Sequence, residues 1–136
     1  MASQESIPRN LDWVEARANC SPHKIFGELQ NGLDEDIAAI NKTKNLEQKE
    51  CEFSMSAIGG GTTVVISQNN TYPQQRVKVG ISGDVIQAED AAVNKKWEAA
   101  VRLNDAGRCV LWVSGEPMEQ WQFRKMVLQR IFFGDE

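Results

Sequence analysis

Few side chains in this sequence could carry acid–base or metal chemistry. His23 is the only histidine, and Cys20 lies three residues before it. Such a pair could serve as a thiol with its base or as two ligands of a metal ion. A metal site needs further ligands, and no second Cys/His pair follows. We therefore expect an incidental surface histidine beside a half-buried cysteine, with no catalytic residue, no metal site and no cofactor.

Carboxylates and basic residues give weaker signals. Residues 34–36 are all acidic, but neighbours on a helix point in different directions, so we expect a solvated face. Arg124, Lys125 and Arg130 lie among aromatic residues, which could suit an anionic ligand or nucleic acid. Nearby acidic residues favour a stripe of salt bridges instead. An enzyme that uses only carboxylates, Arg or Lys stays open, yet the residues favour a non-enzymatic protein.

Composition and charge narrow the partners and the compartment. The chain has 136 residues and a formal net charge of −4, which disfavours a nucleic-acid partner. No apolar run reaches the roughly 18–20 residues that span a bilayer, so we expect no membrane partner. Cys20, Cys51 and Cys109 are odd in number and far apart, unlike a disulfide framework. We expect free thiols, with Cys51 and Cys109 buried on strands, and a cytoplasmic protein.

The first third of the chain is expected to be helical. Residues 1–9 predict a flexible tail, and residues 10–133 a single domain. A short helix should run from Asn10 to about Cys20, and Ser21-Pro22 has the residue types that start a second helix. Gly32 inside that helix costs about 1 kcal/mol relative to Ala. The apolar stripe of the second helix comprises Ile25, Phe26, Leu29, Leu33, Ile37 and Ile40.

Beyond residue 50 the apolar spacing changes from about 3.6 to 2, which indicates strands with one wet face. Residues 89–103 fit both a helix and a strand. The hairpin loop at 104–107 joins them to an evident strand, so we interpret 96–103 as a strand. The expected strands cover residues 50–57, 62–68, 76–81, 85–88, 96–103 and 109–113.

A final helix is expected to open at residues 115–117 and to run to about Phe132. The sequence thus predicts an α+β domain in which two N-terminal helices precede a curved antiparallel meander of about six strands. The C-terminal helix should pack on that sheet. This element order resembles a helix-grip arrangement, although residues 1–10 lack that fold's first strand. The resemblance implies that a cavity can remain between the sheet and the last helix.

An apolar patch on the outer face of the sheet suggests a binding protein. Trp112 and Val110 fall on the strand phase opposite Cys109 and Leu111, and we place Ile86 on the same outer face. Aromatic residues are enriched at interfaces, and an exposed apolar patch marks a contact site unless the N-terminal helix covers it. We therefore expect a small binding protein, inhibitor-like, immunity-like or chaperone-like. It would act through contact with an unknown protein or through homodimerisation.

The alternative hypothesis is a pocket for an apolar small molecule between the curved sheet and the last helix. Its lining would come from side chains whose strand or helix phase points inward. These side chains could equally fill the core. The candidate lining residues are Phe53, Met55, Trp97, Val101 and Trp121.

Overall fold

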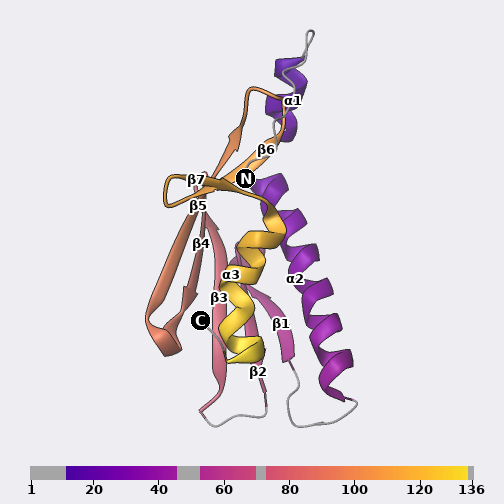
Figure 1. Cartoon of the computed structure of the whole chain (residues 1–136), viewed down its shortest axis with the longest axis vertical. Helices are drawn as coiled ribbons and strands as arrows, with labels where there is room; N and C mark the ends of the chain where they lie inside the picture. The colour runs from indigo at the N-terminus through magenta and orange to yellow at the C-terminus, as the bar shows by residue number, and fades with distance from the viewer. Residues whose placement is uncertain (1–11, 46–52, 70–72, 135–136) are drawn as a thin grey trace.

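The computed structural model describes residues 12–45, 53–69 and 73–134 (Figure 1). Within these ranges, three α-helices, seven strands and two short 3-10 turns follow one another along the chain. The helices are α1 (Trp13–Asn19), α2 (Pro22–Asn45) and α3 (Gln120–Phe133). The strands are β1 (Phe53–Ile58), β2 (Thr63–Gln68), β3 (Gln75–Ser82), β4 (Val85–Asp90), β5 (Lys95–Leu103), β6 (Cys109–Val113) and β7 (Glu116–Met118).

Side chains and turns set the ends of the helices. The Ser21 hydroxyl accepts a hydrogen bond from the Lys24 backbone N–H at 3.2 Å, as an N-cap residue does. At the start of α3, Glu119 and Gln122 form a capping box. Gly134 ends α3 in the left-handed conformation that glycine adopts without strain. Local sequence therefore places both long helices.

The seven strands form one antiparallel sheet in chain order, β1 to β7. Because neighbouring strands keep a continuous register, paired residues of adjacent strands point to the same side of the sheet. Ile66 pairs with Val77, and Ile81 pairs with Ile86, which puts these four on the same face. We call this the covered face, because α2 and α3 lie side by side on it (Figure 1). No described helix packs on the opposite side, which we call the open face.

The core lies between the covered face and the two long helices. Phe53 from β1 contacts Phe132 from α3 edge to face, with ring centroids 4.9 Å apart. Such aromatic pairs contribute to stability beyond the area that they bury. The apolar stripe expected on α2 is buried against the core. This confirms that residues at helical spacing form the core-facing side of α2. The stripe comprises Ile25, Phe26, Leu29, Leu33, Ile37 and Ile40.

One charged pair is built into this core. Asp90, at the end of β4, is 0% exposed, and it is the one buried polar or charged residue within the described ranges. Arg130 of α3 donates to both carboxylate oxygens, Nε to Oδ2 at 2.5 Å and a terminal nitrogen to Oδ1 at 3.1 Å. Asp90 also accepts from the Ala92 backbone N–H. The carboxylate is therefore satisfied on both oxygens, as a buried charge must be.

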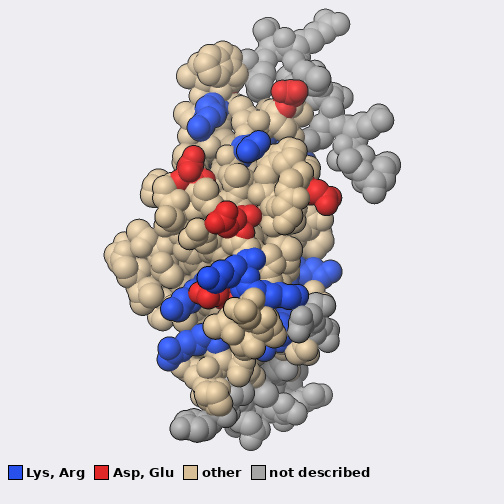
Figure 2. All heavy atoms as spheres, turned by 90° about the vertical axis from the view of Figure 1, so that its left-hand side faces the viewer, with Lys and Arg blue, Asp and Glu red and all other residues tan. Residues whose placement is uncertain are grey.

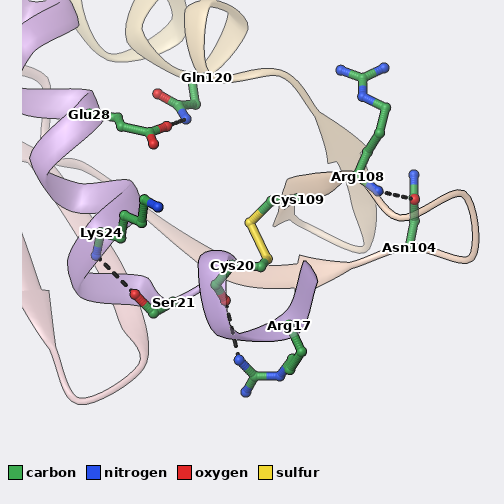
Figure 3. Close-up of a disulfide and its surroundings, with 9 residues drawn as sticks. All are labelled: Arg17, Cys20, Ser21, Lys24, Glu28, Asn104, Arg108, Cys109 and Gln120. Atoms are coloured by element: carbon green, nitrogen blue, oxygen red, sulfur yellow. Dashed lines mark hydrogen bonds between the residues drawn. A yellow bond between two sulfur atoms is a disulfide. The ribbon is translucent and has the colours of Figure 1, made fainter. Parts of the chain in front are cut away.

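A disulfide joins the start of the helical region to the sheet (Figure 3). Cys20, at the end of α1, is bonded to Cys109 at the start of β6, 89 residues later. The expectation of free thiols was therefore wrong for both cysteines, because the fold brings together residues that the sequence separates widely. Cys51 lies outside the described residues. The Arg17 guanidinium donates to the Cys20 carbonyl and holds the end of α1 beside the bond.

The expected architecture is confirmed, with differences at its ends. Residues 95–103 form a strand, as interpreted, which settles the ambiguity in residues 89–103. Residues 116–118 form β7 rather than the first turn of the last helix, so the meander has seven strands instead of about six. The turn at Gly115 folds this segment back onto β6 before α3 begins. The tail expected at residues 1–9 lies outside the described residues.

Candidate functional site

A groove runs between α2 and α3 on the side of the helices away from the sheet. Its volume is about 610 Å³, and it is lined mainly by apolar surface. We call it the helix groove. The α2 wall carries Asp36, Ala39, Ile40 and Thr43, and the α3 wall carries Trp121, Arg124, Lys125, Leu128, Gln129, Phe132 and Phe133.

Two exposed aromatic side chains mark the ends of the α3 wall. Trp121 is 56% exposed and Phe133 is 65% exposed, although both are large and apolar. They are twelve residues apart, which corresponds to about 18 Å along a helix. Lys125 and Gln129 fall between them at steps of four, so one outward stripe of α3 runs along the groove. Leaving two aromatic side chains in water is unfavourable, and it is typical of contact surfaces.

A glycine allows the two helices to approach each other one helical turn before the α2 wall of the groove begins at Asp36. The Arg124 guanidinium lies directly over Gly32, where a Cβ would meet its atoms at 2.2–2.9 Å. From there the Arg124 Nε donates to Asp36 Oδ2 at 2.8 Å. Gly32 therefore has a packing role that offsets its poor helix propensity. Lys125, by contrast, is exposed and forms no ion pair within the described ranges.

Two of the three cations of α3 form salt bridges, as expected, but they do not form the expected surface stripe, because the Arg130 pair lies in the core. Arg124 pairs with Asp36, and Arg130 pairs with Asp90. Both acidic partners come from distant parts of the chain rather than from α3 itself. Lys125 remains available to a ligand in the helix groove.

The outer-face patch expected around Trp112 is only partly present. Trp112 lies on the open face, half-buried, with the Arg102 guanidinium 5.6 Å from its ring centroid. Val110 has the same strand phase but is largely buried. The placement of Ile86 on this face was wrong, because its register with Ile81 and Ala99 turns it into the core, where it is 0% exposed.

The five residues expected to line a sheet–helix pocket do not surround one space. Phe53 is buried against Phe132, and Met55, Trp97 and Val101 pack against the same core. Their side chains contribute to the core between the sheet and the two long helices. Trp121 is exposed on α3 and lines the helix groove instead. The hollow suited to an apolar group is therefore on the outer side of the helices.

The residues considered for catalysis are not assembled into a site. His23 is exposed on the first turn of α2, and the sulfur of Cys20 is committed to the disulfide. In the part of the chain that the structure describes, no group of three or more His, Cys, Asp or Glu side chains could hold a metal ion. No described helix has both the length and the apolar character needed to cross a membrane.

Sequence reasoning missed the helix groove as a feature. The signal was the spacing of Trp121, Lys125, Gln129 and Phe133, which places two aromatic residues on a stripe that also holds polar side chains. A buried stripe would be uniformly apolar, so this mixture indicated an exposed contact face. Comparison with known proteins adds no constraint, since no family model, no curated protein and no solved structure matches this chain.

Proposed function

We propose that this chain is a non-enzymatic binding protein that receives an amphipathic helix of a partner protein in the helix groove. The observation that carries the proposal is the apolar groove itself, flanked by the exposed Trp121 and Phe133. Helix-in-groove recognition uses the apolar face of one helix against a hydrophobic channel. Inhibitor-like, immunity-like and chaperone-like proteins are all consistent with this mode.

The shape of the groove favours a helix as its occupant. The aromatic residues at its two ends are about 18 Å apart, the length of roughly three helical turns. Two parallel helical walls present ridges and grooves that suit a third helix. Lys125, one helical turn from Trp121 on the α3 wall, would pair with an acidic residue on the polar edge of the partner. Aromatic anchors in such a contact commonly carry most of its binding energy.

An apolar small molecule remains the second candidate. The groove volume lies within the range of small-molecule sites, roughly 300–1,000 Å³. Lys125 would then hold an acidic group at one side of the ligand.

Native mass spectrometry of gently purified, untagged protein distinguishes these occupants. We expect a bound polypeptide with the wild type and none with Trp121→Ser/Phe133→Ser. Trp13→Ser is the matched control, because Trp13 is 66% exposed on α1 and lies outside the groove. A mass increment of small-molecule size would support the second candidate, and a symmetric dimer would make the second copy the occupant. Equal loss of the bound polypeptide in the control would contradict the groove as the site.

The cytoplasmic location remains a prediction, and the disulfide makes it testable. Structural disulfides persist mainly in oxidising compartments, so the Cys20–Cys109 bond weighs against the cytoplasm. Thiol alkylation in freshly opened cells gives a direct reading. One reactive cysteine would indicate that the pair is bonded where the protein works, and three would support the cytoplasm.

A further inference from the structure

Basic side chains gather on one half of the open face, across the middle strands of the sheet (Figure 2). Arg76 and Lys78 lie on β3 with the same phase, and Lys96 lies on β5. We call these three residues the basic band. All three are exposed, in a chain whose formal net charge is −4. The band is therefore a local reversal of the overall charge.

The register of the sheet fixes the geometry of the band. Lys78 pairs with Glu89, and Glu89 pairs with Lys96, so one carboxylate lies between two lysines. Strands are about 4.8 Å apart, which puts the two lysine backbones roughly 10 Å from each other. Arg76 is two residues from Lys78, about 7 Å along the strand.

The lysine side chains of the band form no direct ion pair in the described part of the chain. Neither the Lys78 nor the Lys96 side chain forms a salt bridge or a hydrogen bond within the described residues. Arg76 donates to the side-chain oxygen of Gln74, which carries no charge. Three cations therefore face solvent beside two carboxylates, the half-buried Glu89 and the exposed Glu98, which accepts a hydrogen bond from Gln87.

A shallow hollow adjoins the band at the centre of the open face. Its volume is about 380 Å³, and its charged lining residues are Lys78, Lys96, Glu89 and Glu98. A Cβ at Gly80 would lie 2.9 Å from Thr63 Oγ1, so Gly80 gives room to the Thr63 side chain, which also lines the hollow. A segment lying along β3 could enter this hollow beside the lysines.

We propose that the basic band binds an acidic segment of a protein partner in extended conformation. Alternate residues of an extended chain are about 7 Å apart on one side, which matches the spacing of Arg76 and Lys78. A carboxylate at each of these positions would complete the ion pairs that the fold leaves open. None of the three residues of the band is aromatic, and the Arg102 guanidinium lies over the ring of Trp112, which lines a neighbouring hollow with Lys96 and on which a nucleic-acid base would have to stack. This surface lies on the opposite side of the molecule from the helix groove and does not depend on it.

Fluorescence anisotropy with a fluorescein-labelled decaglutamate peptide tests this proposal. We expect Lys78→Gln/Lys96→Gln to weaken binding by at least about tenfold. The control is Lys24→Gln/Lys42→Gln, which removes the same charge from exposed positions on α2 and should change affinity by less than about twofold. Glu89→Gln removes the carboxylate between the lysines and should tighten binding by about two- to threefold.

Three results would overturn the proposal. The first is that the wild type does not bind decaglutamate at 50 mM salt, an ionic strength at which exposed charges interact over roughly 14 Å. The second is equal weakening by the band variant and its control, since that reports net charge alone. The third is tighter binding of decathymidylate, lost with the same two lysines, which would make nucleic acid the ligand. Circular dichroism checks that each variant is folded.

Discussion

The two faces of the same sheet differ in what they leave for a partner. On the covered face, strand residues such as Val77 and Ile86 are buried against α2 and α3. On the open face, their neighbours Lys78 and Gln87 are exposed. Alternation along each strand produces this division, with period 2 and a fixed register. The proposed apolar contact surface therefore lies on the outer side of the helices, and the basic band lies on the outer side of the sheet.

Substitutions on the two faces should change the free energy of unfolding by different amounts. The largest difference is expected at the end of β4. Asp90→Ala would leave the Arg130 guanidinium partly buried without its carboxylate and should cost about 3–5 kcal/mol of unfolding free energy. Its neighbour Glu89 faces the other side, and Glu89→Ala should cost less than about 1 kcal/mol. Urea unfolding followed by circular dichroism measures both. Similar costs for the two substitutions would contradict the assignment of the faces.

Neighbouring residues of β6 test the same division with apolar side chains. Leu111 is buried on the covered face and Trp112 is half-buried on the open face. Leu111→Ala should cost about 2–5 kcal/mol through the cavity that it leaves. Trp112→Ala removes a larger side chain yet should cost about 1 kcal/mol, mainly its contact with Arg102. A larger loss from Trp112 would show that the open face is covered in solution.

The disulfide should contribute about 2–5 kcal/mol to the free energy of unfolding, since it closes a loop of about 90 residues in the unfolded chain. Cys20→Ala/Cys109→Ala and reduced wild type should lose similar amounts of unfolding free energy. Equal losses in the double variant and in the reduced wild type would show that the lost unfolding free energy comes from the disulfide bond itself. If neither change lowered stability, the covalent tie between α1 and β6 would be irrelevant to the fold.

The smallest change in unfolding free energy is expected from a substitution at the contact between α2 and α3. Gly32→Ala gains about 1 kcal/mol of helix propensity but displaces the Arg124 guanidinium from its place over Gly32. The net change in stability should be less than about 1 kcal/mol. A double-mutant cycle of Arg124→Ala and Asp36→Ala should show weak coupling, which vanishes in the Gly32→Ala background. Undiminished coupling there would contradict the close approach at Gly32.

Features that depend on local periodicity could be predicted from the sequence. The α2 stripe, the strands at 76–81 and 109–113 and the hairpin loop at 104–107 each follow from spacing and turn chemistry. β7 was missed because Pro117 is as favourable at the start of a helix as on an edge strand. Ile86 was misplaced because the face of a strand depends on its register with both neighbours.

Features that depend on distant pairs could not be predicted. The Cys20–Cys109 bond, the Arg130–Asp90 pair and the Arg124–Asp36 pair join residues at least 40 positions apart. No local pattern encodes such pairings, and the connectivity of cysteines in particular does not follow from their spacing. The helix groove depends on the relative placement of α2 and α3, which Gly32 and Arg124 set jointly.

Site-specific photocrosslinking on α2 tests the helix groove most directly. A short diazirine-bearing amino acid at Ala39 lies in the groove lining, whereas the same amino acid at Ala38 lies exposed but outside that lining. The two positions are neighbours on one helix, so they differ mainly in the direction in which their side chains point. We expect a covalent adduct with a partner polypeptide from position 39 and none from position 38. Equal adducts from both positions, or an adduct from position 38 alone, would contradict the groove as the binding site.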